Sequence, residues 1–145
     1  MIEKLKNNIM ALREDNAVTI NKSDIEQYLF EVKEAVQNNR YRIDRNRKRI
    51  DNINLFIDYV IDEDKAKEII LDLNVMDFSD ILQNKHVRFG HEQLYVFGKE
   101  VKLLERYGAN EKTVSLYIKF NKLENRYVIV ISFHEQKYPL KYYFR

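Results

Sequence analysis

Residues 128–134 read Val-Ile-Val-Ile-Ser-Phe-His and constrain the fold more than any other stretch of the chain. A run this short and this rich in β-branched residues is typical of a strand that is buried on both faces. We therefore expect it to be the central strand of a sheet, with His134 at its end. Two interpretations of His134 stay open: a side chain that closes a strand without chemistry, or a general acid or base, since histidine is the residue type that changes charge near neutral pH.

Further strands are expected on both sides of this run. Residues 114–120 alternate apolar and polar side chains, which predicts a strand with one buried face. Residues 94–104 predict a long strand, with a bulge at Gly98. After Pro139, residues 140–144 predict an edge strand.

The first half of the chain has the spacing of helices instead. Ser23, with Glu26 three residues later, has the capping-box spacing and predicts a helix over 24–37. Another helix is expected to begin at the acidic residues 62–64, and a polar loop over 83–90. We expect one domain over residues 1–145, with a helical extension over 1–22, a helical half over 23–82 and a sheet half over 92–145. The predicted fold class is α+β, with helices on one face of an antiparallel sheet.

Composition excludes several classes of site. The chain has no cysteine, and its three histidines lack the spacing of zinc ligands, so neither a disulfide nor a metal site is expected. Three glycines leave no glycine-rich loop for a nucleotide phosphate. No apolar run has the length of a membrane span, and the first residues lack the apolar core of a signal peptide, so we expect a cytoplasmic protein without membrane contact.

Residues 40–49 form the one dense basic segment. Its first part alternates like a short edge strand, and from Arg45 the apolar residues recur at helical spacing, which would place Arg45, Lys48 and Arg49 on one helix face. A solvated face and a phosphate-binding face are equally good interpretations. The candidate RNA contacts are Arg45, Arg47, Lys48, Arg49 and, in the loop over 83–90, Arg88.

Several stretches, taken in order, carry a family resemblance: Val32–Val36, the basic segment, Ile69–Leu73, Asp77-Phe78, Tyr95–Lys99, Leu116–Lys119, Ile131–His134 and Tyr138–Leu140. In this order they resemble the MqsR-like (motility quorum-sensing regulator) toxins of type II toxin–antitoxin systems, within the RelE-like ribonuclease superfamily. The stretches span most of the chain beyond residue 22.

The resemblance implies an endoribonuclease that cleaves single-stranded mRNA through attack by the 2′-hydroxyl, without a metal or other cofactor. This chemistry needs a base, an acid and cations for the charge that builds on the phosphate. By position, Tyr117 matches the family's strand tyrosine, and His134 stands where the family has a lysine. Lys119 and Lys99 complete the expected catalytic set.

Two positions depart from the family pattern: Asp80 stands near the family's lysine, and Val96 stands where a glutamine is expected. The implied partners are mRNA and a cognate antitoxin protein, with a ribosome or a second copy of the chain as further contacts.

Two other functions stay open. One is a non-catalytic regulator from a phage or mobile element that uses the basic segment to bind nucleic acid. The other is a protein-interaction domain that works through the acidic helix and residues 1–20.

Overall fold

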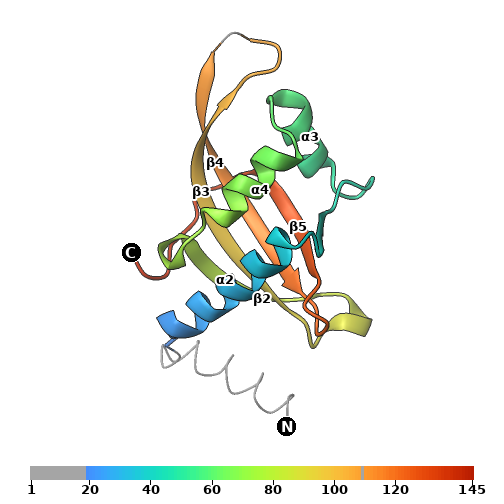
Figure 1. Ribbon diagram of the computed structural model, residues 1–145, viewed down its shortest axis with the longest axis vertical. Coiled ribbons are helices and arrows are strands. Elements are labelled where there is room, and N and C mark those ends of the chain that lie inside the picture. Colours follow the sequence, from blue (N-terminus) through green and yellow to red (C-terminus); the bar gives the residue numbers. More distant parts are fainter. Residues whose placement is uncertain (1–18, 109) are drawn as a thin grey trace.

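The computed structural model describes residues 19–108 and 110–145, and the helical extension expected over 1–22 falls almost wholly outside this range. Five strands form one sheet in the order β1-β5-β4-β3-β2 (Figure 1). Their bounds are Tyr41–Ile43 (β1), Phe78–Gln83 (β2), Gln93–Leu104 (β3), Glu111–Lys122 (β4) and Val128–Glu135 (β5). The α+β class is confirmed.

The sheet differs from the expectation in two respects. β1 runs parallel to β5 while the other neighbours are antiparallel, so the sheet is mixed. β5, expected at the centre, is second from the edge, and β4 is the middle strand. β1 pairs with the outer edge of β5 and β2 adds a strand beyond β3, which leaves β4 in the middle.

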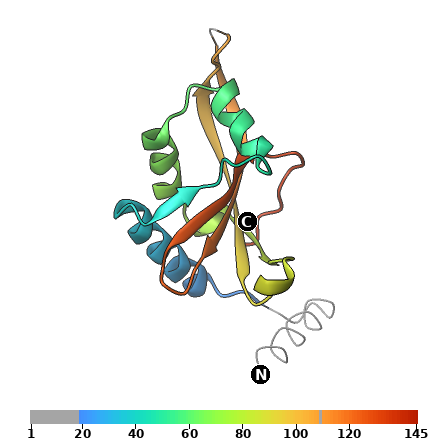
Figure 2. The ribbon, with the colours of Figure 1, turned by 90° about the vertical axis from the view of Figure 1, so that its right-hand side faces the viewer.

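Two helices cover one face of the sheet, as Figure 2 shows with the helices to the left of the strands. They are α2 (Lys22–Gln37) and α4 (Glu63–Leu71). The first helix is confirmed, but its N-cap is Asn21, whose side chain accepts from the N–H of Ser23, so the Ser23 cap is wrong. Asn39 follows α2 with φ 58°, the left-handed conformation that asparagine tolerates and that ends many helices.

The core lies between these helices and the alternate residues of the strands. Val114, Leu116, Ile118 and Phe120 of β4 are all buried against the helices, as their period-two spacing predicts. We call the opposite side the helix-free face. Tyr117 and Lys119 of β4 lie on it, because successive residues of a strand point to opposite sides.

A bulge in β5 decides which side His134 takes. Phe120 pairs with Val130 and Lys119 pairs with Ser132, so Ile131 is an extra residue in β5. Since side chains alternate with a period of two, His134 would otherwise share the helix-covered side with Val130. The extra residue moves it to the helix-free face.

The bulge expected at Gly98 is absent, because the β3–β4 register runs without a shift. Gly98 instead leaves room for the C-terminal segment, residues 136–145, which crosses the helix-free face. A Cβ at this position would lie 2.3 Å from the Tyr142 hydroxyl and 2.8 Å from Leu140 Cδ1. The expected edge strand over 140–144 is also wrong, because this segment is irregular.

The third helix, α3 (Ile50–Asp58), lies along the edge of β5 beyond the end of β1. It begins at Ile50, and residues 44–49 form a loop. The expected helix face of Arg45, Lys48 and Arg49 is therefore wrong, and these side chains are free to point in different directions. Short 3₁₀ turns at Val75–Asp77 (η1) and Val87–Phe89 (η2) flank β2, which stands where a helix end and a loop were expected.

Candidate functional site

The register brings three of the predicted site residues together on the helix-free face. Tyr117 of β4 pairs with His134 of β5, and their rings stack with centroids 5.2 Å apart and planes 9° apart. Lys119 stands two residues along β4, paired with Ser132. A tyrosine, a lysine and a histidine therefore stand side by side on two neighbouring strands.

The His134 ring is held in a defined orientation. Its Nδ1 lies 2.8 Å from the carbonyl oxygen of Glu135. A carbonyl oxygen only accepts, so the hydrogen bond requires a proton on Nδ1 and leaves the Nε2 lone pair open to act as a base. Nearby, Asp51 pairs with Lys137 at 2.8 Å, and first Lys137 and then His134 lower the pKa of its carboxyl.

Tyr117 is a neutral hydrogen-bond donor at physiological pH. Burial is the main cause that raises the pKa of its phenol, and the charge of Asp80 raises it further. Asp80 lies on the same face, because it pairs with Val96 and Val96 pairs with Lys119.

Lys119 is a partly buried cation with like charges beside it. Burial lowers the pKa of its ammonium group, and the charges of Arg49 and Lys85 lower it further. Within residues 19–108 and 110–145, no carboxylate forms an ion pair with any of these three cations. A partly buried charge without a partner is costly, so this arrangement favours an anionic ligand.

A cavity of about 510 Å³ opens beside Lys119. Its apolar lining comes from three strands: Leu82 of β2, Leu94 of β3 and the bulged Ile131 of β5. The polar lining consists of Arg49, Gln83, Asn84, Lys85 and Lys119. The cavity therefore combines apolar surface with three cations, and Lys119 is the residue that it shares with the group of Tyr117, Lys119 and His134.

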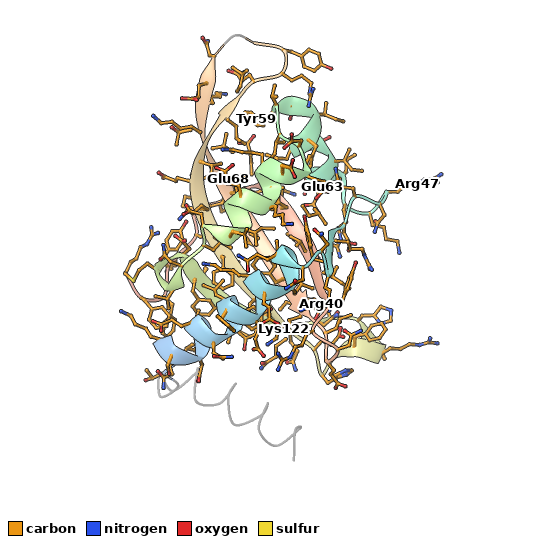
Figure 3. The ribbon with its side chains drawn as sticks, viewed as in Figure 1. Arg40, Arg47, Tyr59, Glu63, Glu68 and Lys122 are labelled. Atoms are coloured by element: carbon orange, nitrogen blue, oxygen red, sulfur yellow. The ribbon has the colours of Figure 1, made fainter. Side chains whose placement is uncertain are left out.

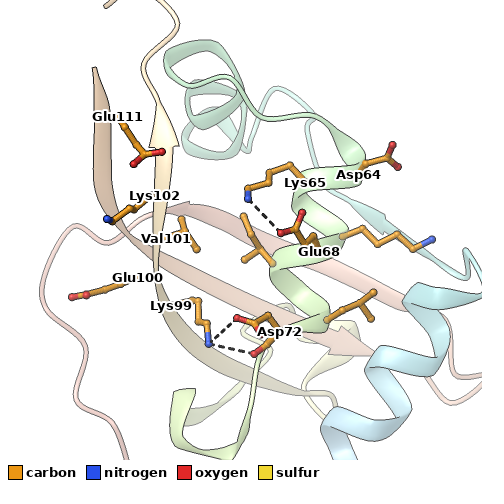
Figure 4. A pocket seen from close by; sticks show the side chains of 12 residues that line it. Asp64, Lys65, Glu68, Asp72, Lys99, Glu100, Val101, Lys102 and Glu111 are labelled. Atoms are coloured by element: carbon orange, nitrogen blue, oxygen red, sulfur yellow. Dashed lines mark hydrogen bonds and ion pairs between the residues drawn. The ribbon is translucent and has the colours of Figure 1, made fainter. Parts of the chain in front are cut away.

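Lys99 does not join this group. It pairs with Leu116 in the register and points to the helix-covered side, where its ammonium lies 3.1 Å from Asp77 and 3.4 Å from Asp72. Figure 4 shows Lys99 and Asp72 side by side. The cavity there, of about 830 Å³, is lined by carboxylates as well as cations. Lys99 thus neutralises the buried carboxylate of Asp77, and we exclude it from the candidate site.

The predicted RNA contacts also separate. Of the basic segment, Arg49 alone lines the cavity. Arg45 forms an ion pair with Glu63 and lies over the Phe56 ring, 4.4 Å from its centroid. Arg47 extends away from the rest of the molecule (Figure 3), and Lys48 and Arg88 are exposed.

Sequence reasoning missed Lys85 and the apolar residues of the cavity. Lys85 was expected in a polar loop over 83–90. It comes two residues after the end of β2 and directly follows Asn84, whose side chain donates to Glu92 at 3.0 Å. The sequence carried no signal for the bulge at Ile131, because residues 128–131 are all apolar and Phe133 is in phase with Ile129 and Ile131.

Among the described residues no group of histidine, cysteine and carboxylate side chains could hold a metal ion. No helix in that part of the chain has the length and apolar character to cross a membrane. Comparison with protein-family models, with curated proteins and with solved structures found no match to this chain.

Proposed function

We propose that the chain is a metal-independent endoribonuclease that cleaves single-stranded RNA on the helix-free face. The observation that carries the proposal is the row formed by Tyr117, His134 and Lys119. It supplies a candidate base, a neutral donor and an unpaired cation on adjacent strands. Rigid strands hold all three, which is what preorganised catalysis requires.

Each residue has a step in the proposed reaction. Nε2 of His134 takes the proton of the 2′-hydroxyl, whose oxygen attacks the phosphorus while the bond from phosphorus to the 5′-oxygen breaks. The Tyr117 phenol and the Lys119 ammonium stabilise the charge on the phosphate oxygens. Lys119 gives a proton to the leaving 5′-oxygen, a step that its lowered pKa favours. The products are a 2′,3′-cyclic phosphate and a 5′-hydroxyl.

The test is incubation of the purified protein with a long unstructured RNA in EDTA, followed by analysis of the ends of the products. We expect cleavage that His134→Ala abolishes and that His91→Ala, at an exposed histidine outside the row, leaves intact. Tyr117→Phe and Lys119→Ala should each slow the cleavage by roughly tenfold to a thousandfold, whereas Tyr107→Phe and Lys112→Ala should not.

An all-deoxy strand of the same sequence should stay whole. Cleavage by the His134→Ala protein at the wild-type rate would contradict the role of His134.

A second function, binding of nucleic acid without cleavage, is favoured by the three unpaired cations, because binding needs no base. It predicts intact RNA and an affinity that falls steeply as salt rises. Arg49→Glu should then abolish binding, while Arg47→Glu on the exposed loop should weaken it less.

In the cell we propose that the chain acts as a toxin restrained by a cognate antitoxin protein. Induced expression should arrest growth, and expression of the His134→Ala protein should not. Co-expression with the product of a neighbouring gene should restore growth. Normal growth at high levels of active wild-type protein would contradict the toxin role.

A further inference from the structure

We infer that the cavity beside Lys119 is a subsite for one unpaired nucleotide of the RNA strand, with the base on the apolar lining and its phosphate on the cations. The inference rests on the proposed function for the identity of the strand as RNA. It adds a place where a single nucleotide is held next to the reacting row.

The size and the lining of the cavity fit a single base. Its volume of about 510 Å³ lies within the usual range for a small organic ligand. Leu82, Leu94 and Ile131 converge on it from three strands, which gives apolar surface against which a base can lie. A base sunk in this recess cannot pair with a second strand, so the subsite selects single-stranded RNA.

The charges fit a phosphate. Arg49 approaches from the N-terminal end of α3, Lys85 from the end of β2 and Lys119 from the last third of β4. Two carboxylates lie on this side of the molecule, Asp80 and Glu92, and neither lines the cavity. Glu92 Oε1 accepts hydrogen bonds from Asn84 and Asn121, each at 3.0 Å. The lining of the cavity thus has three cations and no carboxylate, which suits a phosphate.

The neighbouring surface limits where the strand can continue. At the Gly98 end of the helix-free face, the C-terminal segment is fixed over the sheet. The Gln136 side chain donates to the carbonyl of Leu116 at 3.0 Å, and Ser79 donates to the carbonyl of Lys141 at 2.6 Å. The cavity lies at the other end, beyond Lys119, and no residue of the C-terminal segment is among those that line it.

The test is a binding titration with a fluorescently labelled single strand of 2′-O-methyl RNA, which cannot be cleaved because it has no 2′-hydroxyl. Leu82, 37% exposed at the rim, can be changed to Glu with little effect on the core. Leu82→Glu and Arg49→Ala should each weaken binding by about tenfold or more. The matched controls, Leu104→Glu at an exposed leucine of β3 and Arg88→Ala on the nearby η2 turn, should change it less than about twofold. A duplex of the same sequence should bind more weakly than the single strand.

The outcomes separate the two proposals. The subsite would be overturned if Leu82→Glu and Arg49→Ala bind the strand as well as the wild-type protein does. It would also be overturned if duplex and single strand bind equally. Either result would count even if the wild-type protein cleaves natural RNA. Loss of binding in these variants would uphold the subsite. If the same preparation of wild-type protein then fails to cleave natural RNA, that result would count against the catalytic row alone.

Discussion

The side-chain oxygen of Asn52 accepts a hydrogen bond from the backbone N–H of Phe133 at 2.8 Å. Its amide nitrogen donates to the carbonyl of Ile131 at 2.9 Å, so one side chain of α3 bridges both sides of Ser132 where β1 has ended. These bonds hold the bulge that turns His134 to the helix-free face. The buried carboxamide of Asn52 thus satisfies the backbone hydrogen bonds of β5 that a neighbouring strand would otherwise make.

Replacing Asn52 by Ala should lower both stability and activity. The change leaves a buried N–H and a buried C=O of β5 without a partner, which costs about 2–4 kcal/mol in the free energy of unfolding. It also frees the bulge beside His134. Urea denaturation measures the first effect, and the RNA cleavage rate at a temperature where the variant is folded measures the second. Asn54→Ala, at an exposed position of the same helix, is the control. Equal stability of the two variants would show that the bulge does not depend on Asn52.

Replacement of Lys99 by Met and replacement of Lys119 by Met should have opposite effects on stability and on RNA cleavage. Lys99 is 18% exposed and neutralises Asp77, which is 4% exposed, so Lys99→Met should cost about 1–3 kcal/mol of stability, since Arg145 remains as a partner. Cleavage per folded molecule should not change. Lys119→Met removes an unpaired, partly buried cation and should keep or raise stability while it lowers cleavage. Loss of cleavage in a fully folded Lys99→Met protein would return Lys99 to the site.

Strands with a strict period of two were predictable from the sequence. β4 follows the expected alternation, β3 is the expected long strand without the bulge, and α2 and α4 lie where helices were expected, because helices and long strands are decided by local spacing. β2 was missed because its neighbour is β3, and the pairing rather than the six residues themselves makes it a strand.

The site was predictable only in part. Tyr117, Lys119 and His134 were available as residue types, but their convergence depends on the bulge at Ile131 and on the β4–β5 register. Lys99 shows the reverse case. It was chosen as a cation beside the expected bulge at Gly98, but Gly98 pairs with Tyr117, so Lys99 is one residue out of phase and faces the opposite side of the sheet.

Gly98→Ala should disturb the C-terminal segment. The new Cβ would overlap the Tyr142 hydroxyl, the Leu140 side chain and the Gln136 amide, so the segment must shift, at a cost of about 1–3 kcal/mol. Urea denaturation gives the cost, and trypsin cleavage at Lys141 should become faster. Removal of the hydroxyl by Tyr142→Phe should make the same glycine substitution less costly. An equal cost in both backgrounds would mean that Tyr142 is not what the glycine accommodates.

Affinity for a polyanion should depend on pH through Lys119. The charged ammonium binds phosphate, and burial with the charges of Arg49 and Lys85 places its pKa below the ordinary 10.5. As pH rises, Lys119 therefore loses its proton before an exposed lysine does, and affinity should begin to fall at a lower pH than in a variant whose cation stays charged. Lys119→Arg is that variant, since guanidinium keeps its proton across this range.

A labelled single strand of DNA is the probe, because RNA hydrolyses in alkali. Lys112→Arg, on the exposed part of β4, is the control and should follow the wild-type profile. If Lys119→Arg also follows the wild-type profile, Lys119 does not contact the bound phosphate.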